Sequence, residues 1–361
     1  MISVGIVVQR YGIDVTGAAE TLARNVAERL RRLGSRTTVF TTCARDPRTW
    51  RNEHPPGESL LQGVRIRRFP TTGAGPDSPD LIQGLIAGQE QIDLFIFFSA
   101  HEYPAVEGIK AVSKPVILFP VVRAEPPMLP AATAEAWTRP RALFFLTGAE
   151  MELVRRRFAP PGKLRLVRTG VDIGAVVDAQ PFRRRFQLIA PYLLYVGCIE
   201  AGRELEEVFD HYRALKRETY VDLVLIGKKR MDLQAIQGLK YLGFLSEEDK
   251  RTAFRGALLS LQPSPRQSLA LATLESFSAR TPTLVNRHAP VPLEHVEASG
   301  AGLAYDGKEE FLDGFRRLYR CPALRRRMGE KGLEYVKTFY SWDAVMREIQ
   351  AGIAEILEIT L

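Results

Sequence analysis

The sequence lacks any run of about 18 or more apolar residues, the length that a membrane-spanning helix requires. We therefore expect no segment to cross a membrane. The first residues, MISVGIVVQRYG, have no basic stretch before the apolar one and continue into a strand-like pattern, so they do not resemble a signal peptide. The apolar fraction of 45% and the charged fraction of 25% exclude general disorder. Together these features favour a cytoplasmic protein.

Cysteine is scarce, and the three cysteines, Cys43, Cys198 and Cys321, lie far apart in the sequence. Their spacing matches no metal-ligand motif, so we expect reduced thiols and no metal site. No other visible motif requires a metal, and we expect no cofactor. A glycine fingerprint is also absent. The loop after the first expected strand, QRYGIDVTGAAE, does not have the spacing GxGxxG, which disfavours a nicotinamide dehydrogenase.

Positive charge is in excess, with a formal net charge of +8. It is concentrated in short arginine runs: Arg29, Arg31 and Arg32; Arg65, Arg67 and Arg68; Arg155 to Arg157; Arg183 to Arg185; Arg325 to Arg327. One interpretation is a set of solvated helix faces and loop edges. The other is a surface that meets phosphate or anionic lipid, which implies peripheral contact with the inner membrane face. No recognised nucleic-acid motif accompanies the charge, so nucleic acid is not expected as a partner.

Apolar runs of strand length alternate with helical patterns along the whole chain, which is typical of parallel α/β architecture. The expected strands are Ile2 to Val8, Thr37 to Thr41, Val64 to Phe69, Asp93 to Phe98, Pro115 to Val122, Ala142 to Leu146, Leu164 to Val167, Tyr192 to Val196, Leu223 to Ile226, Tyr241 to Phe244, Leu258 to Leu261, Thr283 to Val285 and Leu303 to Tyr305. The arginine-rich segment 178–191 has proline near both ends and no clear periodicity, so we interpret it as a linker. This predicts a first Rossmann-like domain over 1–177, a second over 192–338, and a C-terminal helix within 339–361.

The most informative segment is QPSPRQSLALATLESFSARTPTLVN, residues 262–286. It predicts a strand, a turn, and a helix that begins near Ala270. Backbone N–H groups of residues 269–271 would be free at that helix start, where the helix dipole favours phosphate. Glu275 lies one and a half turns further, placed to accept hydrogen bonds from ribose hydroxyls. An ordinary buried β-α unit is the simpler interpretation.

This segment resembles the donor-binding signature of glycosyltransferase family four, in which a proline-serine turn precedes two glutamates separated by seven residues. The second glutamate matches Glu275, and the first falls on Gln267. Other matching phrases are YVG at 195–197, LVLIG at 223–227, LGFLS at 242–246, and the loop with Gly17, Ala18 and Glu20. The phrases at 41–58, 64–70 and 118–127 resemble a bacterial branch that often builds surface polysaccharides.

The resemblance implies a GT-B fold, with two Rossmann-like domains facing across a cleft and the last helix returning to the first domain. It also implies a binding site for a nucleotide sugar in the second domain. The residues implied for donor binding are Gly197, Cys198, Arg203, Gly227, Lys228, Gly243, Phe244, Leu245, Ser268, Leu269, Ala270, Leu271 and Glu275. On the acceptor side they are Gly17, Ala18, Glu20, Trp50, His101 and Glu102.

Four positions are implied at the reaction centre: Gln267, Arg203, Arg123 and Glu125. Several depart from the family pattern. Cys198 replaces an arginine, and Arg203 replaces a lysine of the phosphate turn, so one cation that would stabilise the leaving phosphate is missing. Gln267 keeps hydrogen-bonding atoms without charge. Arg123 replaces a histidine and cannot act as a general base, because arginine does not lose its proton in proteins.

Two functions of different classes remain open. The first is a retaining glycosyltransferase that moves a sugar from a nucleoside diphosphate to a glycan, lipid-linked or protein acceptor in surface polysaccharide assembly. The second is a pseudo-glycosyltransferase that keeps the fold and acts as a protein partner or regulator of an active enzyme. A GT-B epimerase would need acid/base carboxylates and histidines gathered in the cleft, and the segment 262–286 fits a transferase better.

Overall fold

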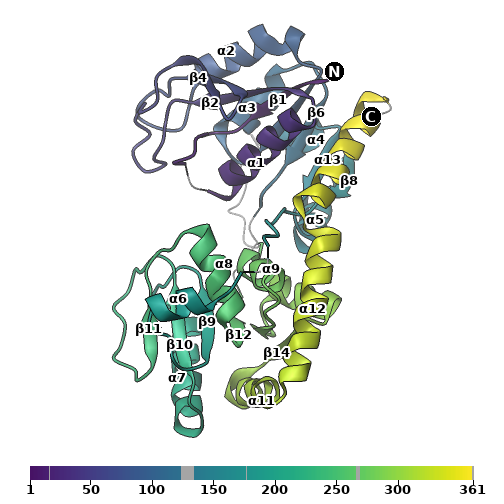
Figure 1. Ribbon diagram of the computed structural model, residues 1–361. Helices are drawn as coiled ribbons and strands as arrows, with labels where there is room; N and C mark the ends of the chain where they lie inside the picture. Colours follow the sequence, from purple (N-terminus) through teal and green to yellow (C-terminus); the bar gives the residue numbers. More distant parts are fainter. Residues whose placement is uncertain (16, 123–133, 176, 266–268, 360–361) are drawn as a thin grey trace. The chain divides into compact units, whose positions relative to one another are not determined.

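The computed structural model describes residues 1–15, 17–122, 134–175, 177–265 and 269–359, without the side chains of Ala134 and Arg203. The chain divides into two compact units (Figure 1). Unit 1 comprises Met1–Thr169 together with Val345–Leu361, and unit 2 comprises Gly170–Ala344.

Unit 1 is built on an eight-stranded sheet in the order β3-β4-β2-β1-β5-β6-β7-β8. The strands are β1 (Ser3–Val7), β2 (Arg36–Thr42), β3 (Gly57–Leu61), β4 (Val64–Phe69), β5 (Leu94–Phe98), β6 (Val116–Phe119), β7 (Ala142–Phe145) and β8 (Lys163–Leu166). Neighbouring strands pair in parallel except β3, which pairs antiparallel with β4 at the sheet edge. The central strands are fully buried apolar runs such as LFIFF, as expected where helices cover both faces.

The helices of unit 1 are α1 (Ala18–Arg32), α2 (Pro79–Gly88), the short 3₁₀ helix η1 (Gln89–Gln91), α3 (Tyr103–Ala111), α4 (Ala134–Thr138), α5 (Gly148–Phe158) and most of α13 (Trp342–Leu357). One apolar core joins the side chains of α2 and α3 to the sheet, including Leu81, Leu85, Phe95 and Ile109. Residues 345–361 are grouped with this unit although they follow unit 2 in sequence. Ile349 and Ile353 of α13 are completely or almost completely buried.

Unit 2 is built on a six-stranded parallel sheet in the order β11-β10-β9-β12-β13-β14. Its strands are β9 (Tyr192–Val196), β10 (Asp222–Ile226), β11 (Leu239–Tyr241), β12 (Leu259–Gln262), β13 (Thr283–Asn286) and β14 (Gly302–Tyr305). Its helices are α6 (Gln180–Arg185), α7 (Arg203–Glu218), α8 (Glu247–Gly256), α9 (Leu271–Ser278), α10 (Pro290–Ser299), α11 (Gly307–Arg320) and α12 (Pro322–Phe339). Among the described residues, its core includes an apolar cluster around α7, α11 and the inner strands and two further clusters.

Three segments differ from the sequence expectation. The strand expected over Tyr241 to Phe244 lies earlier, as β11, and shares only Tyr241 with the expected range. Residues 57–61, where no strand was expected, form strand β3, whose side chains are mostly exposed and therefore show no apolar pattern. The segment 178–191, interpreted as a linker, contains α6, and its Phe182 and Leu188 are buried in a core cluster of unit 2. The units meet in sequence at Thr169 and Gly170 instead.

Long apolar helices are absent from the described residues, since none of their helices has the length and hydropathy needed to cross a membrane.

Candidate functional site

The order of strands in unit 2 reverses between β9 and β12. From β9 the chain proceeds outward through β10 and β11, and from β12 it proceeds the other way through β13 and β14. In parallel α/β sheets, ligands bind outside the carboxyl ends of the two strands at such a switch point. The segments that follow β9 and β12 contain Gly197, Cys198, Leu269 and Ala270, all predicted donor-binding residues. The topology therefore brings two distant parts of the predicted site to one edge of the sheet.

Three glycines hold the loops at this edge close together. The Gly197 N–H donates to the Ile226 carbonyl at 3.0 Å, and the Gly227 N–H donates to the Gly243 carbonyl at 2.9 Å. A Cβ atom on Gly227 would lie 1.9 Å from the carbonyl oxygen of Gly197, and its φ is +138°. No other residue fits there, so this position requires glycine to let the loops approach each other.

Cys198 lies at the exposed rim of this edge. Its Sγ donates to Glu200 Oε2 at 3.4 Å, and the Tyr195 hydroxyl donates to its carbonyl at 2.9 Å. Burial and the Glu200 carboxylate raise the pKa of the Cys198 thiol. The thiol is therefore neutral at neutral pH, and Cys198 supplies no charge where the family pattern has arginine.

Helix α9 begins at the same edge, and none of the side chains that the structure describes caps it. Its N-cap residue, Ala270, is buried and adopts left-handed backbone angles of φ 46° and ψ 40°. Such angles cost an L-residue roughly 1–2 kcal/mol, so the fold around the turn holds them in place. Leu269 is half-buried and Leu271 is 41% exposed. The first N–H groups of a helix have no partner within it, so this start can bind an anion.

Glu275 follows on α9, and the structure gives it a partner that the sequence did not reveal. Lys250 Nζ of α8 lies 2.8 Å from Glu275 Oε1 and 2.8 Å from Glu247 Oε2. Burial raises the pKa of Glu275, and Lys250 offsets part of that rise. Burial lowers the pKa of Lys250, but its contacts with Glu275 and Glu247 outweigh that effect and raise it. The ion pair uses Glu275 Oε1, and no described residue forms a hydrogen bond with Oε2, which is available to a hydroxyl group of a ligand.

The remaining predicted donor residues line the outer rim. Lys228 is exposed, and its carbonyl accepts the Ile199 N–H at 2.9 Å. Phe244 is 83% exposed, whereas Leu245 packs against a core cluster. An exposed aromatic ring beside glycine loops is a surface on which a flat base can stack.

Unit 1 has a second switch point, between β1 and β5. Arg10, after β1, forms a buried ion pair with Glu20 of α1. A Cβ atom on Gly17 would meet the Glu20 carboxylate, so Gly17 allows Glu20 to fold back over the start of its helix. Ala18, the first residue of α1, is exposed. The Arg10 guanidinium therefore anchors the predicted acceptor loop.

Glu102 lies after β5, at the N-cap of α3. Burial and the nearby Glu20 raise its pKa to about 8, against a smaller lowering effect of Arg10. Its Oε2 is buried and has no hydrogen-bond partner among the described residues. The neighbouring His101 is exposed, and its Nε2 lies 3.4 Å from Ser99 Oγ. Glu102 is thus mostly protonated at neutral pH and can donate a hydrogen bond.

Two further features concern the acceptor side. Trp50 has a positive φ of 53° and its carbonyl accepts the Thr71 hydroxyl at 2.8 Å, so its loop is held against residues after β4. Glu150, which sequence reasoning missed, is buried and accepts the Val122 N–H at 2.8 Å and the Leu146 N–H at 3.0 Å. Burial raises its pKa to about 7 despite those hydrogen bonds. Glu150 thereby fixes the ends of β6 and β7, directly before position 123.

Several predicted positions lie outside the described residues. These are Arg123, Glu125, Gln267 and Ser268. Arg203 is the first residue of α7, but its side chain is also outside the description. Within the described ranges, no group of three or more histidine, cysteine, aspartate or glutamate side chains is arranged to hold a metal ion.

Residues 177–335, less than half of the chain, match the family model described as glycosyl transferases group 1. A curated relative, glycosyltransferase 1 domain-containing protein 1 from Xenopus tropicalis, is 22% identical over 193 residues. The alignment covers 51% of this chain and 56% of that protein, so it spans little more than half of the relative's length. Residues 177–335, which the family model matches, contain the β9–β12 edge and α9.

Solved structures extend the likeness over almost the whole chain. Sucrose-phosphate synthase from Thermosynechococcus elongatus has a TM-score of 0.73 at 15% identity, covering 99% of this chain and 100% of that one. A glycosyltransferase from Rickettsia africae has a TM-score of 0.76 at 11% identity, covering 99% of both chains. HepE from Anabaena, in complex with UDP and glucose, has a TM-score of 0.72 at 13% identity, covering 98% of this chain and 100% of that one. The fold is that of GT-B glycosyltransferases, which confirms the predicted fold class.

Proposed function

We propose that this chain is a glycosyltransferase that transfers a sugar from a nucleoside-diphosphate sugar, with retention of configuration, to a glycan, lipid-linked or protein acceptor. The observation that carries the proposal is the edge of unit 2, where a helix start that no described side chain caps and a half-buried carboxyl group lie at one switch point. The group 1 family match over 177–335 supports it.

In this proposal each part of the edge has one task. The backbone N–H groups at residues 269–271 bind the donor phosphates, and Arg203 neutralises their charge. Glu275 accepts hydrogen bonds from the ribose hydroxyls. Gln267 faces the sugar. On the acceptor side, Arg123 and Glu125 bind the acceptor, and protonated Glu102 donates a hydrogen bond to it.

No metal ion is assigned a role, because a helix start and arginine can neutralise a diphosphate. The cytoplasmic location, peripheral contact with an anionic membrane, and a role in surface polysaccharide assembly stay predictions.

Calorimetric titration with UDP, GDP and ADP, with and without Mg²⁺, tests the donor site. UDP is the first probe, since the similar Anabaena protein was solved with it. We expect one nucleotide to bind and Glu275→Ala to weaken it at least tenfold, about 1.4 kcal/mol. Glu334→Ala, an exposed glutamate of α12, is the matched control and should change nothing. If no nucleotide binds, the donor-site assignment is wrong.

A pseudo-glycosyltransferase is the second candidate, favoured by the neutral thiol of Cys198 at a position where the family carries a cation. Such a protein would bind the nucleotide but turn over little sugar. Cys198→Arg tests this at an exposed site. We expect the variant to hydrolyse the matching sugar nucleotide at least tenfold faster, because the cation stabilises the leaving diphosphate. An unchanged rate in a variant that still binds the nucleotide would mean that charge at position 198 does not limit turnover.

A further inference from the structure

The loops that follow β9 and β10 run side by side in the register of the two strands. The last residue of β9 pairs with the last residue of β10, and three positions later an isolated parallel bridge pairs Ile199 with Lys229. The same register places Cys198 beside Lys228. The Lys228 carbonyl accepts the Ile199 N–H at 2.9 Å and lies 3.8 Å from Cys198 Sγ.

Lys228 and Lys229 point to different sides of this pair of loops. Lys229 Nζ lies over the ring of Tyr241, 6.0 Å from its centroid. Successive side chains of an extended chain point to opposite faces, so the side chain of Lys228 lies on the face that Cys198 occupies. Burial and Glu200 raise the pKa of the Cys198 thiol, and the positive charges of Arg230 and Lys228 offset part of that rise. Both cations therefore lie close enough to act on position 198.

Only one of these two cations is neutralised. Arg230 Nη1 lies 3.5 Å from Glu200 Oε2, and both side chains are exposed. Lys228 is also exposed and forms no ion pair with any residue that the structure describes. The rim around Cys198 therefore keeps one positive charge that no described carboxylate balances.

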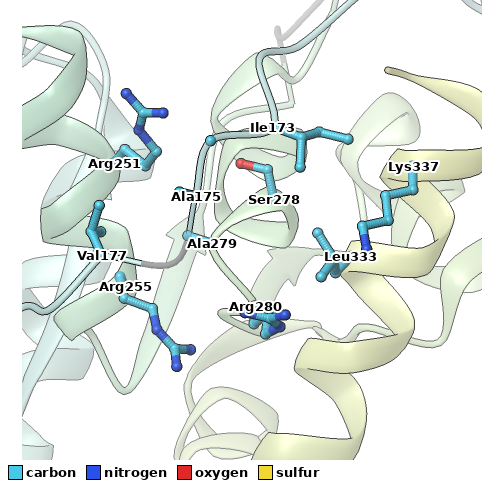
Figure 2. Close-up of a pocket in the computed structure, with 11 residues that line it drawn as sticks. Ile173, Ala175, Val177, Arg251, Arg255, Ser278, Ala279, Arg280, Leu333 and Lys337 are labelled. Carbon is cyan, nitrogen blue, oxygen red and sulfur yellow. The ribbon is translucent and has the colours of Figure 1, made fainter. Parts of the chain in front are cut away.

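Other basic side chains of unit 2 are not arranged around a ligand edge. Arg251 and Arg255 of α8 line a cavity near the end of α9, but Figure 2 shows their guanidinium groups pointing in opposite directions. They do not converge on one anion. Lys228 differs from them because it lies at the carboxyl edge of the sheet, where the strand order directs a ligand.

We propose that Lys228 supplies the positive charge that position 198 lacks, and stabilises the diphosphate of the sugar donor from the neighbouring loop. The inference rests on the proposed function and assigns a cation to the same site. It accounts for a neutral residue at position 198 without loss of the charge that the reaction requires.

The chemistry of transfer explains why this charge matters. The bond between the anomeric carbon and the distal phosphate oxygen breaks, and its electron pair stays on that oxygen. An oxygen of the acceptor, or of water in hydrolysis, forms the new bond to the carbon and releases its proton to solvent. A cation beside the diphosphate stabilises the negative charge that grows there. Lysine provides it as a compact charge on a flexible chain, without the fixed fork of arginine.

The test is calorimetric titration of the full chain with whichever of UDP, GDP and ADP it binds, and with the corresponding nucleoside. Lys228→Gln should weaken binding of the diphosphate about tenfold, because one charge-assisted contact is lost. It should leave binding of the nucleoside unchanged, since the nucleoside has no phosphate. Lys229→Gln removes the same charge from the next residue and is the matched control, which should bind both ligands as the wild type does.

A charge moved to position 198 separates electrostatics from a structural role of the lysine. Cys198→Arg in the Lys228→Gln background should restore most of the lost affinity for the diphosphate, because the two positions share one register. Cys198→Arg alone should have a smaller effect, because Lys228 already supplies the charge. The pseudo-glycosyltransferase candidate predicts the opposite, a gain in hydrolysis from Cys198→Arg alone.

The inference is overturned if Lys228→Gln and Lys229→Gln bind the diphosphate equally well, or if Lys228→Gln loses affinity for the nucleoside to the same extent. It is also overturned if Cys198→Arg restores nothing in the Lys228→Gln background. These results leave the donor site in place, because the wild type still binds its nucleotide. A wild type that binds no nucleotide contradicts the proposed function itself, and the role of Lys228 with it.

Discussion

Glu102 and Glu275 are both carboxyl groups withdrawn from water, but only Glu275 forms an ion pair with a described residue. In unit 1, Arg10 forms an ion pair with Glu20. Glu102 therefore lies near the Glu20 carboxylate and forms no ion pair with a described residue. The two glutamates should therefore respond to pH in different ways.

Glu102→Gln should stabilise the protein at alkaline pH. The folded-state pKa of Glu102, about 8, lies above its ordinary value of 4.5, so ionisation disfavours the folded state as the pH rises between these values. Glutamine keeps the shape without that penalty. We expect the variant to gain roughly 2–4 kcal/mol over the wild type at pH 9 and little at pH 4, measured by denaturant unfolding. Glu334→Gln, at an exposed position, should show no such dependence.

Lys250→Met should destabilise unit 2, because it leaves Glu275 withdrawn from water without its cation. Both side chains keep some exposure, 18% for Lys250 and 25% for Glu275, so the expected loss is about 1–3 kcal/mol, less than for a fully buried pair. A double-mutant cycle with Glu275→Gln checks the cause. If the free energy of unfolding lost in the double variant equals the sum of the two single losses, the two side chains do not stabilise each other.

At the level of elements, the loops after β9, β10 and β11 depend on glycine for different reasons. Gly227 and Gly243 both have positive φ, but only at Gly227 would an added Cβ atom overlap a neighbouring backbone. Gly243 has nothing within 4 Å of a Cβ atom. A side chain would therefore strain the backbone at both positions, but it would overlap a neighbouring residue only at position 227.

Gly227→Ala should cost more than about 3 kcal/mol, whereas Gly243→Ala should cost about 1 kcal/mol from strain alone. The added methyl group at position 227 overlaps the Gly197 carbonyl and forces the loops apart. Thermal unfolding of the two variants measures the difference. Equal losses would indicate that the β9 loop can move away without cost.

The same elements show what a sequence can predict. Buried strands such as β5 were predicted well, because apolar runs of that length are decisive. Strand β3 was missed because an exposed antiparallel edge needs no apolar pattern. The Lys250–Glu275 pair could not be predicted, because only the packing of α8 on α9 brings together two residues 25 positions apart. Glu150 was missed because a glutamate in the first turn of a helix is ordinary in sequence, and only the structure shows its burial.

At the scale of the whole molecule, each unit has its own apolar core, and the core of unit 1 includes side chains from the end of the chain. Ile349 of α13 is fully buried in unit 1, and Leu223 of β10 is fully buried in unit 2. The ion pairs of α13, such as the pair between Lys163 and Glu355, are exposed and contribute little to the stability of the fold. Burial of its apolar face is what holds the helix.

Ile349→Ala should therefore cost roughly 2–5 kcal/mol and act on unit 1. Hydrogen exchange followed by mass spectrometry locates the effect, because it reports opening segment by segment. We expect faster exchange in residues 1–169 with Ile349→Ala and in residues 170–344 with the matched Leu223→Ala. Faster exchange throughout the chain in both variants would mean that the two units open as one.

The placement of residues 345–361 in unit 1 also affects the order in which the chain can fold during synthesis. Domains generally fold in the order in which they leave the ribosome. In this chain, synthesis of unit 2 is complete before synthesis of unit 1. Unit 1 lacks the apolar face of α13 until the last part of the described chain has been synthesised. Residues 1–169 are therefore synthesised first. The surface that later receives α13 stays exposed to solvent while unit 2 is translated and folds.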